Sequence, residues 1–182
     1  MTQAIPGVAP SQVREVTIMT VWPSLAATGI GQMFGRLYAI DIGVRPFGIP
    51  LTLGPLIALM SSPLMAAIYF LMRLPRVPLV LVGFKNPFCS HYRLTNRRIV
   101  VENPYHGGEI KSVTLDRFDS IAVEIQPGQQ WYKAGDLVFR QGATETFRIT
   151  GVPRPETFRQ TCMKAHLSFV GVGQARAMGA AV

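Results

Sequence analysis

The longest apolar stretch of the chain lies between Arg45 and Arg73, where 27 residues carry no charge. About 20 apolar residues cross the hydrocarbon core of a bilayer as a helix, so residues 49–72 predict a transmembrane helix. Pro55 and Pro63 lie within this segment and predict a kink, which membrane helices tolerate. The alternative is a buried core helix, which so long an uncharged run disfavours in a protein of this size.

A second uncharged stretch, Val16–Gly35, precedes this segment. Its later apolar residues recur on one helical stripe with polar residues on the other side, a pattern typical of a helix that lies in the membrane interface. The small residues Ala27, Gly31 and Gly35 are also spaced four apart, as in closely packed membrane helices. Residues 16–48 therefore predict an amphipathic helix region that lies on the membrane or packs against another helix, and whether it also spans stays open.

From about Val77 the pattern changes to short runs typical of strands, several of them alternating, which are separated by turn residues. These runs predict antiparallel strands, and Gln141–Thr144 carries the strongest hairpin signal. The runs are His91–Leu94, Ile99–Glu102, Glu109–Leu115, Ile121–Ile125, Asp136–Arg140 and Thr146–Thr150. A helix is predicted after Pro153, with Pro155 near its first position and apolar residues recurring on one face. That face comprises Phe158, Cys162, Ala165 and Phe169.

These patterns predict a membrane-anchored α+β fold, with transmembrane or interfacial helices followed by an antiparallel barrel or sandwich. The barrel would contain six to seven strands, capped by the C-terminal helix. The predicted parts are a tail over 1–15, the amphipathic region over 16–48, the transmembrane helix over 49–72, a linker over 73–87, the strand-rich domain over 88–170 and a flexible tail over 171–182.

The composition agrees with attachment to a membrane. Apolar residues make up 48% of the 182 residues and charged residues 15%, which excludes a disordered chain and is low for a soluble one. Two cysteines exclude a disulfide scaffold. After Met72 there are 15 basic and 8 acidic residues, so the positive-inside bias places this part in the cytoplasm. The residues expected to flank the membrane are Trp22, Arg73, Arg76 and Lys85.

The strand-rich part resembles a known family. The segments HYRLTNRRIVVE, EIKSVTLDRFDSIAVEI and ETFRITGVPRPETFRQ, between Phe88 and His166, are similar to the bacterial pleckstrin-homology-like (PH-like) domain of membrane-anchored proteins. Residues Tyr92–Arg98 and the Val-Pro-x-Pro-x-x-Phe helix entry are the most specific part. The resemblance implies a curved, partly open barrel of two packed sheets closed by the helix. It also implies a binding or scaffolding role beside a membrane, without catalytic residues, in a bacterial inner membrane protein.

Three arginines in the first predicted hairpin, Arg93, Arg97 and Arg98, are candidates for contact with anionic phospholipid headgroups. A guanidinium group pairs well with phosphate oxygens. The alternative is a structural role in the hairpin turn, which the resemblance favours. Diffuse attraction to anionic headgroups needs no specific site and is expected in either case.

Other chemistry is not expected. Cys89-x-His91 and Cys162-x-x-x-His166 have spacings that resemble zinc ligands, but Cys162 lies on an apolar helix face and the combination is not a standard zinc pattern. The glycines at 29, 31 and 35 do not follow a strand, so a dinucleotide cofactor is not expected. No nucleophile elbow or paired carboxylates indicate an enzyme. Basic residues interleaved with acids make nucleic acid an unlikely partner.

Two functions stay open at this stage. The first is a non-enzymatic accessory or assembly subunit that docks onto a larger membrane protein complex. Its expected contacts are Ala27, Gly31 and Gly35 in lipid, and Trp131 and Tyr132 in a loop in water, unless Trp131 folds back over the barrel end. The second is a module that senses anionic phospholipids at the cytoplasmic surface.

Overall fold

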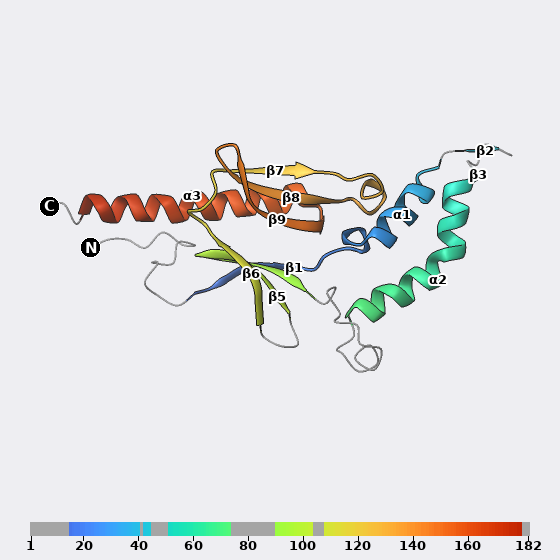
Figure 1. Cartoon of the computed structure of the whole chain (residues 1–182), viewed down its shortest axis with the longest axis horizontal. Helices are drawn as coiled ribbons and strands as arrows, with labels where there is room; N and C mark the ends of the chain where they lie inside the picture. Colours follow the sequence, from blue (N-terminus) through green and yellow to red (C-terminus); the bar gives the residue numbers. More distant parts are fainter. Residues whose placement is uncertain (1–14, 41, 45–50, 74–89, 104–107, 180–182) are drawn as a thin grey trace.

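The computed structural model describes residues 15–40, 42–44, 51–73, 90–103 and 108–179. Within these ranges the chain forms two antiparallel sheets and a long C-terminal helix, an α+β arrangement (Figure 1). The larger sheet has the strand order β1-β4-β5-β6, and the smaller has the order β7-β8-β9. The bounds are Thr17–Val21, His91–Thr95, Arg98–Asn103 and Gly108–Thr114 in the larger sheet, and Ser120–Glu124, Ala134–Gln141 and Thr144–Pro153 in the smaller.

The remaining elements are the helices and two short strands, β2 and β3. Helices η1 and α1 follow β1, and helix α2 precedes β4; Figure 1 shows α1 and α2 at one end of the molecule and the C-terminal end of α3 at the other. The short strands β2 and β3 pair with each other between α1 and α2. The bounds are Leu25–Ala27 for η1, Gly29–Tyr38 for α1, Gly43–Val44 for β2, Leu51–Thr52 for β3, Leu53–Arg73 for α2, Gln130–Tyr132 for η4 and Pro155–Gly179 for α3.

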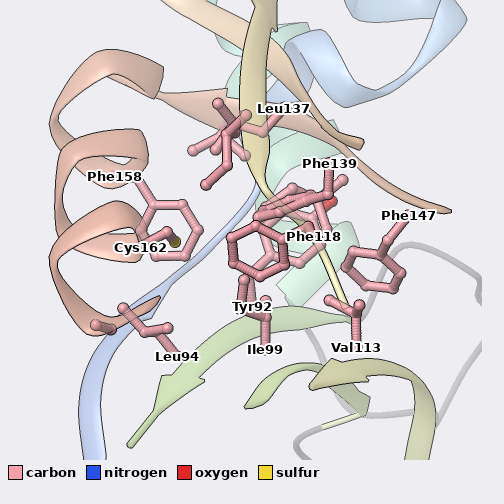
Figure 2. Packing of buried hydrophobic residues seen from close by; sticks show 14 of the residues in the cluster. Tyr92, Leu94, Ile99, Val113, Phe118, Leu137, Phe139, Phe147, Phe158 and Cys162 are labelled. Atoms are coloured by element: carbon pink, nitrogen blue, oxygen red, sulfur yellow. The ribbon is translucent and has the colours of Figure 1, made fainter. Parts of the chain in front are cut away.

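The hydrophobic core lies between the two sheets and one face of α3 (Figure 2). Alternation along each strand sends every second side chain inward, as Leu94 and Ile99 show from the larger sheet and Leu137 and Phe139 from the smaller. Helix α3 contributes its apolar face, including Phe158. Burial of these side chains holds the two sheets together because each removes apolar surface from water.

The coarse fold prediction is confirmed. Each of the six predicted runs overlaps one strand, and the predicted C-terminal helix begins at Pro155. The sheets of four and three strands together contain seven strands, the upper end of the predicted range of six to seven. Thr95 shapes the first hairpin, because its hydroxyl oxygen accepts hydrogen bonds from the backbone N–H groups of Arg97 and Arg98.

The prediction for residues 16–48 is wrong at its start. Residues Thr17–Val21 form β1, which pairs antiparallel with β4 in the larger sheet, with Val21 opposite Tyr92. The unbroken lack of charge suggested a helix, but five β-branched residues in Val16–Val21 favour a strand. The strand-rich domain is therefore not confined to 88–170, since its sheet includes a strand from before α2.

Another boundary differs from the prediction. Helix α3 continues to Gly179, although residues 171–182 were expected to form a flexible tail. Its last turns contain Gln174 and Ala175, good helix formers, and they continue the helix although Gly171 and Gly173 weaken it. Pro63 lies inside α2, which bends along its length in Figure 1.

Candidate functional site

Two of the three candidate arginines hold carboxylates of the same chain. Arg93 pairs with Glu102 on the neighbouring strand β5. Nε of Arg98 donates to Oε1 of Glu15 over 2.9 Å, and Nη1 of Arg98 donates to Oε2 of Glu109 over 2.6 Å. The hydrogen bond from Arg98 lowers the pKa of Glu15 below its ordinary value. These ion pairs compete with any lipid phosphate for the same guanidinium donors.

The third candidate, Arg97, lies half-buried in the turn between β4 and β5. The structure thus places Arg93, Arg97 and Arg98 on one hairpin, as the sequence predicts. Two of them have a structural role, because Arg93 joins β4 to β5 and Arg98 joins the hairpin to Glu15, which precedes β1.

A buried polar cluster that sequence reasoning missed joins the smaller sheet to the N-terminal segment. Asp136 on β8 is 5% exposed, and its Oδ1 accepts hydrogen bonds from Nε2 of Gln129 over 2.7 Å and from the N–H of Gly151 over 2.9 Å. Gln129 is fully buried, and its Oε1 accepts from the N–H of Gln126 over 2.8 Å. The sequence signal for this cluster is Asp136, a carboxylate within the apolar run of β8, because a buried acid requires hydrogen-bond partners.

The small residues of α1 are used for contacts within the chain. A Cβ added at Gly35 would lie 2.0 Å from the carbonyl oxygen of Gly128, in the loop before η4. A Cβ added at Gly31 would lie 2.0 Å from the carbonyl oxygen of Leu25 in η1. Both glycines are buried. Their small size therefore permits α1 to pack closely against η1 and against the loop before η4.

Ala27 belongs to the same docking contact. The N–H of Ser24 donates to the carbonyl oxygen of Gly151 over 2.9 Å, and a Cβ added at Gly151 would lie 2.5 Å from Cα of Ala27. Gly151 has a φ of +62°, a conformation that favours glycine. The segment η1–α1 is thus bound to the end of β9 as well as to the loop before η4.

Four aromatic side chains meet where α1 and η4 join; we call Phe34, Tyr38, Trp131 and Tyr132 the aromatic junction. The ring centroid of Tyr38 lies 5.8 Å from that of Phe34, 5.4 Å from that of Trp131 and 6.4 Å from that of Tyr132. The hydroxyl of Tyr38 also lies 2.5 Å from Oγ of Ser61 on α2. The junction therefore connects α1, α2 and η4.

Burial differs sharply within the aromatic junction. Tyr38 is 5% exposed, whereas Trp131 is 43% exposed. Partial burial raises the pKa of Tyr132 to about 12, and its hydroxyl has no hydrogen-bond partner in the part of the chain that the structure describes. The structure thus brings Tyr132 against Gly35, and Trp131 lies beside Tyr38 with an accessible face.

Two of the four expected membrane-flanking residues lie in the described part of the chain. Trp22 follows β1 directly, and its ring centroid lies 5.3 Å from that of His91 at the start of β4. Arg73 is the last residue of α2. Arg76 and Lys85 lie outside the described residues.

Cys162 and His166, one of the two pairs with zinc-like spacing, have other contacts. Cys162 is fully buried in the core, and burial raises its pKa to about 12. Nδ1 of His166 lies 2.6 Å from the carbonyl oxygen of Leu115. Among the described residues no group of three potential metal ligands occurs, and Cys89 lies outside them.

Helix α2 has two different faces. Every third or fourth residue is at least partly covered by the protein, and Gly54 and Met65 are buried within this inner stripe. The outer face is apolar and exposed; its large members are Leu53, Leu56, Leu59, Met60, Leu64 and Phe70. Residues Leu53–Phe70 are long and apolar enough to cross a membrane, by length and composition alone.

Two features therefore bear on function: the exposed face of Trp131 in the aromatic junction, and the outer face of α2. Both lie at the end of the molecule where α1 and α2 are found (Figure 1). A comparison of the chain with family models, curated proteins and solved structures finds no match.

Proposed function

We propose that this protein is a non-enzymatic, membrane-attached binding module, in which α2 holds a PH-like sandwich at a membrane surface. The observation that carries the proposal is the outer face of α2. Leu59 and Met60 are 70% and 77% exposed, in a helix without a charge before Arg73. A water-soluble protein rarely leaves so large a contiguous apolar surface uncovered.

The arrangement of strands supports the PH-like assignment. Four strands and three strands pack face to face, and α3 covers the core between them. This is the architecture that the resemblance of Tyr92–Arg98 and the α3 entry implies. A closed core of this kind has no need of α2 for its own stability, so α2 is available for attachment.

We further propose that the module docks onto a larger membrane protein complex as an accessory or assembly subunit. Trp131 supports this, because large aromatic side chains with accessible faces are frequent anchors at protein interfaces. It lies beside Tyr38, whose hydroxyl contacts α2, so a partner bound there would sit next to the membrane. Specific phospholipid sensing by Arg93 and Arg98 is less well supported, since both hold carboxylates.

We place the sandwich on the cytoplasmic face of a bacterial inner membrane. Arg73, Arg76 and Lys85 follow the apolar helix closely, and basic residues near a membrane segment favour the cytoplasmic side. Anionic lipids of that leaflet would attract them, at about 1 kcal/mol for each basic residue near the surface.

Membrane attachment is tested by fractionation of cells that express the full chain. The wild type should sediment with membranes, and Leu59→Glu combined with Met60→Glu should move it to the soluble fraction. The matched control is Leu167→Glu with Met178→Glu on α3, which are 64% and 71% exposed and should leave the protein in the membrane. A soluble wild type, or an α2 variant that stays in the membrane, would contradict attachment through α2.

Docking is tested by purification in mild detergent. Trp131→Ala should lose the co-purifying complex while the thermal midpoint stays near that of the wild type. Ile110→Ala on β6 removes another exposed apolar side chain and should keep the complex. If Trp131→Ala lowers the midpoint while the complex stays bound, Trp131 serves the fold and not the interface.

A further inference from the structure

The pairing of β1 with β4 constrains how α2 meets a membrane. In this antiparallel pair Val21 lies opposite Tyr92, so the chain leaves the sheet after Val21 and re-enters it at His91 at the same end. The segment between Val21 and His91, which includes α2, therefore starts and finishes at the same end of the larger sheet. If that sheet lies in water on one side of a bilayer, the intervening segment must cross an even number of times.

The part of the segment before α2 does not provide a crossing. Helix α1 has ten residues, about 15 Å of helix, which is half of the roughly 30 Å hydrocarbon core. It is also bound to the sandwich along its length, since Gly35 packs against Gly128 and Nε of Arg36 donates to the carbonyl oxygen of Pro127. The first turn of α2 lies beside the last turn of α1, because a Cβ at Gly54 would lie 2.2 Å from the carbonyl oxygen of Tyr38.

The part after α2 offers no second crossing either. Between Arg73 and Ser90 the longest run without charge is Val77–Phe84, eight residues. A helix needs about 20 apolar residues to cross, and an unpaired extended strand leaves its backbone polar groups unsatisfied in lipid. A single crossing by α2 would therefore put β1 and β4 on opposite sides of the membrane.

From this topology we propose that α2 does not cross the bilayer but lies within one leaflet, entering and leaving on the side of the sandwich. This inference rests on the proposed attachment through α2 and replaces the transmembrane expectation for residues 49–72. The inner stripe of α2 faces the protein through contacts such as Ser61 with Tyr38, and its outer face contacts acyl chains. Pro63 allows the helix to bend in the plane of the interface.

The charges of the chain select a lipid surface as the occupant of that outer face. No acidic residue occurs between Ile42 and Ser90, while four basic residues do. On the described surface near the aromatic junction, Arg36 and Lys133 are exposed. An apolar helix face bordered by basic residues and lacking acidic ones complements an anionic leaflet, and it is less suited to a second copy with the same positive charge.

The side on which each end of α2 lies can be measured with a membrane-impermeant maleimide. In the full chain with Cys89→Ser, single cysteines are introduced as Asp41→Cys before α2, Lys85→Cys after it, and Ala143→Cys in the exposed β8–β9 turn. Buried Cys162 stays in place. In sealed vesicles of known orientation, all three should react from the same side. Reaction of Asp41→Cys and Lys85→Cys from opposite sides would overturn the inference while leaving membrane attachment intact.

The depth of α2 in the bilayer provides a second, independent test. A fluorescent dye on Met60→Cys, in vesicles of phosphatidylethanolamine and phosphatidylglycerol, should be quenched more by lipids spin-labelled near the headgroup than by lipids labelled at the chain end. A crossing helix would give the opposite order, since residue 60 lies near its middle. No quenching together with a dimer in solution would show that α2 covers a second copy, which would overturn both the inference and attachment through α2.

Discussion

Oδ1 of Asp136 lies 2.7 Å from Nε2 of Gln129 and also accepts the N–H of Gly151 over 2.9 Å. A single buried carboxylate thereby joins the loop before η4 to the end of β9. The N-terminal segment packs on both of these places, with Ser24 bonded to Gly151. The platform that holds α1 therefore depends on one acidic side chain.

Removal of that carboxylate should destabilise the fold. Asp136→Ala leaves the amide of Gln129 and the N–H of Gly151 buried without this acceptor, and we expect a loss of about 3 kcal/mol in the free energy of unfolding. Urea titration monitored by circular dichroism measures the loss. The control Asp116→Ala, at an exposed position, should stay within about 0.5 kcal/mol of the wild type. Equal effects of the two changes would contradict a special role for Asp136.

Two glycines of the same helix should respond differently to the same change. Gly35→Ala places a methyl group against the carbonyl of Gly128, so we expect a loss of about 1–3 kcal/mol from overpacking. Gly29→Ala meets nothing within 4 Å and should leave stability unchanged or raise it by up to about 1 kcal/mol. Thermal unfolding compares them. A tolerated Gly35→Ala would show that α1 is not packed against that loop.

The thiol of Cys162 should be inert in the folded protein. Its side chain is fully buried and its pKa is raised to about 12, so at pH 8 almost no thiolate forms and no reagent reaches it. In a Cys89→Ser background, a disulfide reagent should react only after denaturant is added. Rapid reaction without denaturant would mean that α3 opens from the core.

Acid should weaken the connection between Glu15 and the β4–β5 hairpin. Arg98 lowers the pKa of Glu15 below 4.5, so its contribution is fully present above that pH and is lost as the pH falls through the lowered value. We expect the free energy of unfolding to fall less steeply below pH 4.5 in Glu15→Gln than in the wild type. Urea titrations between pH 3 and 7 provide the comparison, and identical slopes would exclude this contribution.

Sequence patterns identified the strands whose two faces differ. Leu94 alternates with the polar neighbours Arg93 and Thr95, so β4 could be predicted from local order alone. Strand β1 was missed because its residues lie within a long uncharged run, and its β-branched content was the weaker signal. The residues of β4 that pair with β1 lie 71 to 78 positions away along the chain, which no local pattern identifies.

The candidate site was predicted less completely. Tyr132 and Gly35 were identified separately, but their proximity depends on the turn that carries Gly128 and on the docking of η1–α1. The contact between Asp136 and Gln129 could not be predicted, because its stabilisation requires a third group, the N–H of Gly151. Such clusters are determined by tertiary packing and not by periodicity.

The pairing of β1 with β4 also sets an order of events during synthesis. The ribosome delivers β1 first, and α2 leaves the exit tunnel before β4, the partner strand of β1, has emerged. Until then β1 has no neighbour in its sheet and presents unpaired backbone groups. Capture of α2 by the bilayer at that stage would hold β1 close to the membrane surface where β4 later emerges. Membrane contact would then precede closure of the sheet, and would shorten the search for the most distant pairing in the fold.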